Sequence, residues 1–346
     1  MSKAFSELIS SLREISYEDF LTNLGRIDSD VTNMLKSKSA EQFRQAIRNL
    51  IEERSQDLYR LDFGNTEKAP ELLAGEVAAV DGALALPMQQ YSIGQAICVA
   101  VGSATHRRPF EKALAYWSAG LKLEGVLDPR EFLEQQYEFV YGLSQTAVLR
   151  YCETLQAAKL AEPYVFLDGP IVYEWLAGLK EPTDLYRRLL REKKVMGVMK
   201  DLRNNKWLQA IGSVLKSGEL FVVENLAQHL EKARSSNRNP GERGTHALDD
   251  FLRDTARFIL RGVFKPRKQA YGFEVHTNEL SLMSRLPAAD CQMNHVGHEI
   301  PYLLNQVDYQ IKQHCGRGML EQSIAQKMYR ESEELFFGNI DEHDFR

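Results

Sequence analysis

The sequence predicts an α/β fold in which helices flank a mixed β-sheet. Short apolar runs typical of buried strands alternate along the chain with segments whose apolar residues recur every three or four positions, as in amphipathic helices. The composition is that of a globular protein, with 44% hydrophobic and 26% charged residues. At 346 residues the chain is long enough for about two domains, or for one domain with a large insertion.

The N-terminal half is predicted to pass from helices into the sheet. Residues 1–62 are expected to form an N-terminal helical region, because apolar residues recur at helical spacing among Glu, Arg and Lys. Apolar runs at 76–82 and 91–102 predict two strands, the first closed by an Asp-Gly turn signal. A long helix is expected from Asp128 to Leu160, since Asp128 can cap it and a proline suits its first turn.

The C-terminal half continues this alternation. Residues 164–168 are the clearest buried strand, and a further strand is predicted at 195–200. A polar stretch rich in Gly and Pro predicts a mobile loop at 233–244. The other expected elements are helices over 203–232, β-like stretches at 269–276 and 279–286, helices at about 300–314 and 319–335, and a solvated acidic tail at 337–346.

Charge and cysteine content exclude several classes of protein. A net charge of −5 rules out a uniformly basic surface that coats DNA, but it is compatible with a local basic groove beside an acidic site. The four cysteines are scattered without a CxxC pair, which predicts reduced thiols and a cytoplasmic protein. The sequence has no GxxxxGKS/T motif, no apolar run of transmembrane length and no secretory signal, so we expect neither a P-loop ATPase nor a membrane protein.

Two predicted strands end in an aspartate in the same way. Asp81 and Asp168 each follow an apolar run and precede a glycine, which permits a sharp turn and the close approach of a ligand. A poorly solvated carboxylate needs a partner, and Mg²⁺ and Mn²⁺ prefer carboxylate oxygen. Two such cations can activate a water and stabilise the leaving oxygen in phosphodiester hydrolysis. The alternative is that each Asp-Gly pair only opens a turn.

A third carboxylate is expected from the long helix that leads into the second of these strands. Glu153 is the candidate nearest that strand, while Glu134 and Glu138 lie about four turns closer to the start of the helix. Glutamates on a helix more often belong to its solvated face, so that interpretation stays open here.

The order of these segments resembles that of the NurA nuclease family. In that family a strand ending in Asp-Gly, a helix with a glutamate, a second Asp-Gly strand, a strand ending in lysine and a proline-led helix follow one another. The matching segments are 77–82, Glu153, 165–169, 196–200 and 300–308, which places a NurA-like nuclease domain at 70–336.

The resemblance implies an RNase H-like core and a deoxyribonuclease that depends on Mn²⁺, or on Mg²⁺. It implies a 5′-to-3′ exonuclease with endonuclease activity on single- or double-stranded DNA. It also implies a homodimer that acts with a HerA-type hexameric ATPase translocase, in DNA end processing or in defence against phage.

The same resemblance assigns the site residues. It implies the following catalytic set: Asp81, Glu153 and Asp168 as metal ligands, Lys200 as a phosphate contact and Tyr271 as the counterpart of a family tyrosine on a late strand.

The proline-led C-terminal helix departs from the family pattern. Asp308 stands where the family has a histidine, and an aspartate there would complete an all-carboxylate metal set. His298 or His295, just upstream, is the alternative ligand. Ala83 and Pro170 replace the small hydroxyl residue that usually follows each Asp-Gly pair, for which we expect only a tuning effect.

Basic clusters are the candidate DNA contacts, because a nuclease must neutralise phosphates along its channel. The cluster before Tyr271 and Phe273 is the most suggestive, since aromatic rings can stack on unpaired bases, whereas 187–194 fits a solvated helix face. The predicted nucleic-acid-binding residues are Arg107, Arg108, Arg261, Lys265, Arg267 and Lys268.

Two alternative functions are weighed against the nuclease. A catalytically silent RNase H-like module that binds DNA or serves as an adaptor of a translocase complex would account for the changes after the Asp-Gly pairs and at Asp308. An RNA-guided endonuclease is disfavoured, because no guide-binding domain is evident in 346 residues.

Overall fold

The computed structural model of the chain describes most residues between 36 and 315 and a few before them. It divides into two compact units, residues 1–53 and 54–346. The described residues are 10, 16, 18–19, 33, 36–61, 69–84, 89–91, 94–108, 110, 114–119, 137–174, 176–177, 179–202, 205–235, 245–294 and 300–315.

The first unit contains helix α3, Lys38–Glu53, as its apolar spacing predicts. The helical expectation fails a few residues later, in the second unit. Residues 58–60 form strand β1 (Leu58–Arg60), which pairs antiparallel with β8 (Glu219–Asn225). Pairing with a strand far along the chain therefore overrides the local helical pattern.

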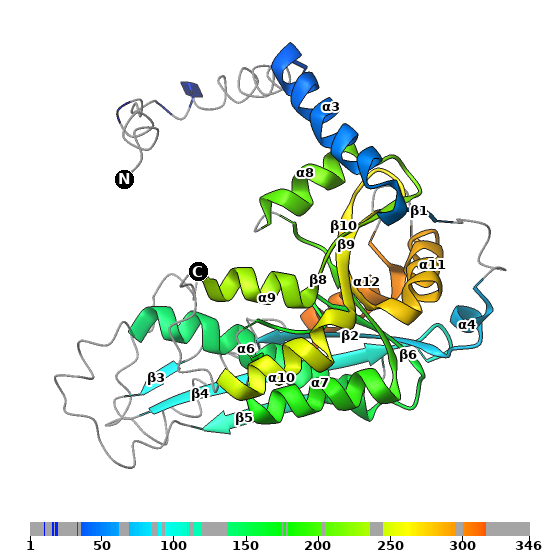
Figure 1. Cartoon of the computed structure of the whole chain (residues 1–346). Coiled ribbons are helices and arrows are strands. Elements are labelled where there is room, and N and C mark those ends of the chain that lie inside the picture. Colours follow the sequence, from blue (N-terminus) through cyan, green and yellow to red (C-terminus); the bar gives the residue numbers. More distant parts are fainter. Residues whose placement is uncertain are drawn as a thin grey trace. The chain divides into compact units, whose positions relative to one another are not determined.

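The second unit is built on a mixed sheet of ten described strands (Figure 1). Besides β1 and β8 these are β2 (Val77–Leu84), β3 (Gln89–Tyr91), β4 (Gly94–Ala104), β5 (Leu114–Ala119), β6 (Tyr164–Asp168), β7 (Lys194–Met199), β9 (Ile259–Lys265) and β10 (Tyr271–His276). Their order is β1-β8-β9-β10-β7-β6-β2-β4-β3, with β5 paired to β4. The pairs β2–β6 and β6–β7 are parallel and the others are antiparallel.

The central strands have the RNase H-like arrangement. The antiparallel group β5-β4-β2 continues into the parallel strands β6 and β7. Helix α6 (Tyr137–Lys159) precedes β6, and α7 (Lys180–Glu192) supplies the crossover that two parallel neighbours need. The prediction of an α/β fold with a mixed sheet flanked by helices is confirmed.

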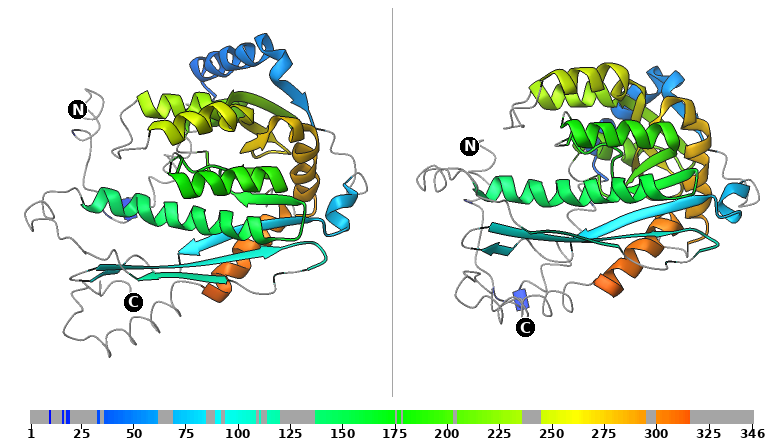
Figure 2. Two further views of the ribbon diagram at one scale, coloured as in Figure 1. Left: turned by 60° about the horizontal axis from the view of Figure 1, so that its bottom comes forward. Right: turned by 90° about the horizontal axis from the view of Figure 1, so that it is seen from below.

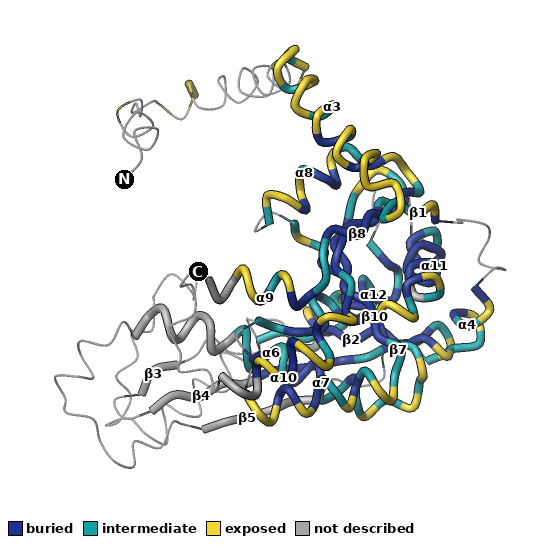
Figure 3. The backbone as a smooth tube through the Cα atoms, in the orientation of Figure 1, coloured by how far each residue is buried: buried dark blue, intermediate teal, exposed yellow. Residues whose placement is uncertain are grey.

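Helices cover both faces of the sheet (Figure 2). Side chains on β6 alternate between the two layers: Phe166 packs with α11 (Leu280–Cys291) and α12 (Tyr302–Cys315), while Leu167 packs on the side of α6 and α7. The sheet between these layers is largely buried (Figure 3). The remaining helices of this unit are α4 (Pro70–Leu73), α8 (Lys206–Val214), α9 (Leu226–Ser235) and α10 (Thr245–Asp254). None of the described helices is long and apolar enough to span a membrane.

Two further predicted elements are wrong. Residues 280–286, expected as a strand, begin α11, because a short apolar run does not distinguish a buried helix from a buried strand. Residues 219–225, expected within helices, form β8, whose first five residues are buried in the sheet. The predicted helix at 319–335, the tail at 337–346 and most of the loop at 233–244 lie outside the described residues, and 233–235 belong to α9.

A buried aspartate holds the start of α12. Asp290 is fully buried; its Oδ2 accepts a 2.9 Å hydrogen bond from the Leu303 amide, and its Oδ1 lies 2.7 Å from Nε2 of His106. The His106 ring also stacks on Tyr302 with 5.4 Å between ring centroids. This contact ties α12 to the end of β4 and therefore fixes how the helix lies against β2 and β4.

We expect Asp290→Ala to lower the free energy of unfolding by about 2–4 kcal/mol, because it leaves the buried Leu303 amide and His106 without their acceptor. Urea denaturation measures the change. Asp250→Ala is the control, since this exposed aspartate pairs only with an exposed arginine on the same helix. Equal stability of the two variants would contradict the assignment.

Candidate active site

Strand register places Asp81 and Asp168 side by side. β2 and β6 are parallel and their last paired positions are Val80 and Leu167, so the two aspartates are the next pair along. The residues before them, Val80 and Leu167, face α6. Side chains alternate along a strand, so Asp81 and Asp168 point toward the opposite face of the sheet, where α12 lies.

Asp168 ends β6 and is partly exposed, as predicted. The prediction that the first strand also ends at its aspartate is wrong, because β2 continues to Leu84 by pairing with β4. Asp81 is therefore buried inside the strand, and its Oδ1 accepts a 2.8 Å hydrogen bond from the Gly82 amide.

The side chain of Lys200 lies between the two aspartates. Lys200 directly follows β7, in which Val198 pairs with Asp168. Its Nζ is 2.8 Å from Oδ2 of Asp168 and 3.4 Å from Oδ2 of Asp81. Burial opposes the charge of this ammonium, but the carboxylates of Asp81 and Asp168 outweigh burial and raise the pKa of Lys200. Lys200 therefore stays charged and joins the two aspartates.

Glu153 approaches the two aspartates from α6, on the other face of the sheet. The helix packs against β2 where Gly82 has no side chain, and a Cβ there would lie 3.1 Å from Oε1 of Glu153. Burial raises the pKa of Glu153 to about 7. Burial also raises the pKa of Asp81 well above its usual value, and the charges of Asp168 and Glu153 add to that rise. The three carboxylates are thus close enough to repel one another.

Arg150 is a site residue that the sequence did not single out. Its Nη1 lies 2.7 Å from Oε2 of Glu153 and also donates to the carbonyl of Asp168. Gly169 makes room for it, because a Cβ at that position would lie 2.7 Å from the guanidinium carbon, and the residue has a φ of 111°. Its spacing of three residues from Glu153 on one helix face is the signal that could have indicated it.

Asp308 lies on α12, close enough to Lys200 that its charge helps to raise the pKa of that lysine. Its Oδ2 is 2.8 Å from Nζ of Lys312, one turn further along the helix. The structure thus brings Asp308 near Lys200. The alternative ligands His295 and His298 lie outside the described residues.

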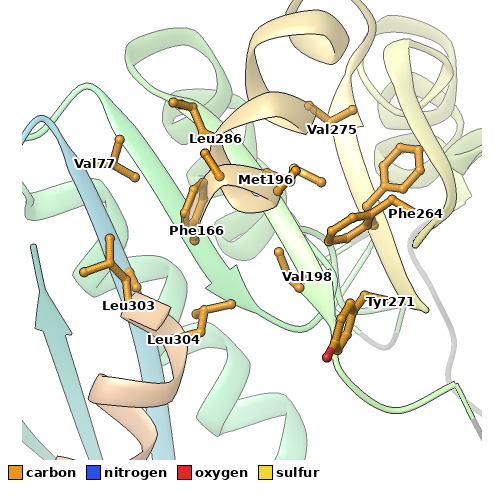
Figure 4. Close-up of a cluster of buried hydrophobic side chains, with 14 of the residues drawn as sticks. Val77, Phe166, Met196, Val198, Phe264, Tyr271, Val275, Leu286, Leu303 and Leu304 are labelled. Carbon is orange, nitrogen blue, oxygen red and sulfur yellow. The ribbon is translucent and has the colours of Figure 1, made fainter. Parts of the chain in front are cut away.

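Tyr271 is placed beside Lys200 by the sheet. Gly272 pairs with Met199, so Tyr271 is the next residue opposite Lys200. Its ring is fully buried against Phe264, with 5.7 Å between centroids (Figure 4). Phe273 is also fully buried. The expectation that these two rings stack on bases is therefore wrong, because β10 is an internal strand covered on both faces.

A cavity of about 920 Å³ adjoins the carboxylates. Asp168, Lys200 and Arg150 line one part of it, and Arg261 and Glu274 line another. A volume of this size is in the range of small-molecule and cofactor sites. The cavity therefore offers space for substrate next to Asp168 and Lys200.

Glu274 supports the segment that follows Asp168. This fully buried carboxylate on β10 accepts hydrogen bonds from the amides of Ile171, at 2.9 Å, and Val172, at 3.4 Å. The segment can cross β7 because Gly197, which pairs with Glu274, has no side chain. Glu274 was missed in the sequence, where a lone glutamate in an apolar strand carries no motif.

The predicted DNA-binding residues separate into different places. Arg107 and Arg108 lie at the far end of β2, because the side chain of Arg107 packs on Gly75. Gly75 precedes Asp81 by six residues, which is about 20 Å at ~3.3 Å per residue of strand. Arg108 forms an ion pair with Glu162 there. The structure does not bring this pair to the carboxylates.

The C-terminal basic cluster lies closer to the carboxylates. Lys265 and Lys268 line a second cavity, of about 550 Å³, which shares Lys200 with the first. Arg267 lies between them in sequence and is half-buried, whereas Arg261 is buried in the first cavity.

The carboxylates of Asp81, Glu153 and Asp168 fit a divalent cation by their donor chemistry. Mn²⁺ and Mg²⁺ prefer such oxygens, and Oε1 of Glu153 is buried without a hydrogen-bond partner among the described residues. Within that same part of the chain, no three His, Cys, Asp or Glu side chains converge closely enough to enclose a metal ion as they stand. The ammonium of Lys200 occupies the space between the two aspartates.

Comparison with known proteins relates the chain to one family. Residues 75–243 match the family model described as the NurA domain. The crystal structure of the NurA nuclease from Sulfolobus solfataricus is similar with a TM-score of 0.51 and 11% identity, over 92% of this chain and 99% of that chain. That likeness shows the fold.

Two other solved structures are less similar. A crystal structure of NurA bound to dAMP and manganese has a TM-score of 0.41 and 9% identity, over 80% of this chain and 94% of that chain. The Argonaute of Marinitoga piezophila, in complex with 5′ OH guide RNA and target DNA, has a TM-score of 0.29 and 9% identity, over 72% of this chain and 31% of that chain. A search of curated proteins finds no match.

Proposed function

Because the chain belongs to the NurA family, we propose that it is a metal-dependent deoxyribonuclease centred on Asp81, Glu153 and Asp168. One observation carries this proposal: strand register brings two aspartates together, with Glu153 beside them and the charged Lys200 between them. Buried carboxylates that repel one another are costly unless cations compensate their charge. Phosphodiester hydrolysis with divalent cations uses such a cluster.

Each charged residue then has a role in the reaction. Asp81, Glu153 and Asp168 would hold Mn²⁺ or Mg²⁺, and Asp308 is the candidate for a further ligand from α12. Divalent cations bound there would supply the charge that activates the attacking water and stabilises the leaving oxygen. Lys200 would release its aspartates and bind an oxygen of the scissile phosphate.

Two further residues would shape this centre. Arg150 would orient Glu153 and fix the end of β6 through its hydrogen bond to the Asp168 carbonyl. Tyr271, next to Lys200 in the sheet, would hold the lysine side chain in position.

The DNA strand would approach along the cavity that Lys265 and Lys268 line, with Arg267 at its border, because that cavity shares Lys200 with the site. Lysines along such a path neutralise backbone phosphates without reading sequence. Arg107 and Arg108 would contact DNA only beyond the site, at the far end of β2.

The finer features of the activity follow from family membership. We infer a cytoplasmic homodimer that works with a HerA-type hexameric ATPase, as a 5′-to-3′ exonuclease with endonuclease activity. Its context would be DNA end processing or defence against phage. The sequence given contains no GxxxxGKS/T motif, and in this proposal the partner ATPase supplies the translocation.

We expect the purified protein to shorten end-labelled single- or double-stranded DNA with Mn²⁺, and not with EDTA. Asp81→Ala should lose at least about 100-fold in rate, because it removes one of the two adjacent aspartates of β2 and β6. Gel analysis with Mn²⁺, Mg²⁺ and EDTA measures both effects. Label on either end of the strand reports the direction of digestion.

Equal cleavage by Asp81→Ala and the unaltered protein would overturn the assignment of the site. If the folded protein cuts under none of these conditions, the assay is repeated with the HerA-type ATPase added. If no cleavage is detected with the ATPase either, the alternative of a catalytically inactive adaptor is favoured.

A further inference from the structure

Arg261 forms part of the floor of the 920 Å³ cavity. It lies on β9, and its register partner is Glu274 on β10, which in turn pairs with Gly197 on β7. The side chain of Arg261 is only 10% exposed. A buried guanidinium needs acceptors for its donors, since arginine stays charged at any ordinary pH.

The guanidinium of Arg261 has donors without acceptors. Among the described residues, its Nε and Nη1 are buried and have no hydrogen-bond partner. The nearest carboxylate oxygens are 3.4 Å from Nε, on Glu274, and 4.0 Å from Nη1, on Glu224. Nη2 lies 3.9 Å from the sulfur of Met199, which is a weak acceptor. Buried unsatisfied donors are costly, and at a cavity wall they indicate a ligand that supplies the acceptor.

Each of the two neighbouring carboxylates also has other partners, although Oε1 of Glu274 remains in an ion pair with Nε of Arg261. Oε2 of Glu274 accepts the amides of Ile171 and Val172. Oε2 of Glu224 lies 2.6 Å from Nζ of Lys232, and its Oε1 lies 3.4 Å from Nδ1 of His229. Glu274 and Glu224 therefore balance the charge of Arg261 as ion-pair partners, but neither accepts a hydrogen bond from its Nε or Nη1.

The charge of the cavity favours an anion once the carboxylates at its other end are neutralised. Its cationic lining consists of Arg150, Lys200, Lys206 and Arg261. Its carboxylates are Asp168, which would be a cation ligand, Glu274, which is held by backbone amides, and Glu174 and Asp201. The four carboxylates equal the four cationic side chains in number, so divalent cations at Asp168 would leave the cavity with an excess of positive charge.

We propose that Arg261 binds a phosphate group of the DNA strand other than the one that is cut. This inference rests on the proposed nuclease function. Arginine presents several donors in one plane, which suits the oxygens of phosphate. Strands β6 and β9 are three strand spacings apart, about 14 Å, so a phosphate at Arg261 is distinct from one between Asp168 and Lys200. A terminal phosphate and an internal phosphodiester share this chemistry.

The test is DNA binding by the full-length protein, measured by fluorescence anisotropy over a series of salt concentrations. Ca²⁺ replaces Mn²⁺, and the length of the DNA is checked on a gel. The probes are a 5′-phosphorylated oligonucleotide, the same oligonucleotide with a 5′-hydroxyl, and a single-stranded circle. We expect Arg261→Gln to weaken binding about tenfold and to reduce the slope of log K against log salt by about 0.7, the value for one phosphate contact on a single strand.

The three probes distinguish the source of the phosphate. A loss confined to the 5′-phosphorylated probe supports a terminal phosphate, and an equal loss on all three supports an internal phosphodiester. Arg253→Gln is the matched control, because it removes the same charge from an exposed position on α10, and it should leave affinity and slope unchanged. Unchanged affinity and slope in Arg261→Gln would overturn the inference.

A second variant controls for the possibility that Arg261→Gln fails to fold. Arg261→Gln leaves Glu274 without its balancing charge, whereas Arg261→Gln combined with Glu274→Gln removes both buried charges. The double variant is compared with Glu274→Gln alone, which keeps the arginine. Equal DNA binding by these two would also overturn the inference. The readout is DNA binding, so the two proposals can fail separately. A protein that binds DNA through Arg261 but never cleaves it would contradict the proposed nuclease activity and still support the phosphate site at Arg261.

Discussion

Replacement of Asp168 by asparagine is expected to reduce DNA cleavage by a factor of about 1000 or more while the protein stays folded. The amide has the size of the carboxylate but lacks the charge that would hold a divalent cation. It also removes the charge that pairs with Lys200 at 2.8 Å and that adds to the raised pKa of Asp81. Asp168 is partly exposed at the end of β6, so the substitution leaves the packed core intact.

The measurement is the initial rate of shortening of end-labelled DNA with Mn²⁺, beside a thermal melt followed by circular dichroism. Asp184→Asn on α7 is the matched control, because it makes the same chemical change at an exposed carboxylate paired with Lys180. That variant should cut at the normal rate. More than a tenth of the normal rate in Asp168→Asn would remove this residue from the catalytic set.

The two aspartates could be predicted from the sequence because their signal is local. An apolar run followed by Asp-Gly marks a buried strand and its carboxylate, and parallel pairing brings the two aspartates together. Only Asp168 ends its strand, whereas β2 continues past Asp81 to Leu84. Glu153 could be indicated only through its place in an ordered set of segments. The match of residues 75–243 to the NurA domain confirms that resemblance.

Other parts of the site depend on contacts that no local pattern encodes. Arg150, Glu274 and Gly197 act through hydrogen bonds and close approaches between segments that are distant in sequence. The basic clusters looked alike in sequence, yet register sends Arg107 to the far end of β2 and buries Arg261 in the cavity. Burial also decides the role of Tyr271, whose ring is enclosed by the sheet and its helices. Sequence pattern thus identifies residue types at strand ends, whereas register and layer decide which of them meet.

Gly197→Ala is expected to lower the free energy of unfolding by about 2–4 kcal/mol and to reduce cleavage with it. A Cβ at this position would lie 2.5 Å from the carbonyl oxygen of Gly169 and 2.8 Å from the amide nitrogen of Ile171. Both are backbone atoms of the segment that follows Asp168, so that segment must lift away from β7. Lifting it breaks the hydrogen bonds that Glu274 accepts and displaces the end of β6.

The contrast with Gly272→Ala tests this explanation by urea denaturation. A Cβ at Gly272, on the neighbouring strand β10, would first meet the terminal methyl carbon of Met199 at 2.8 Å, and a flexible side chain can move aside. We expect Gly272→Ala to lose clearly less stability than Gly197→Ala and to keep most of its activity. If both variants lose the same stability, the cost at Gly197 is that of any added methyl group in the sheet. The backbone crossing would then not be what holds Asp168 in place.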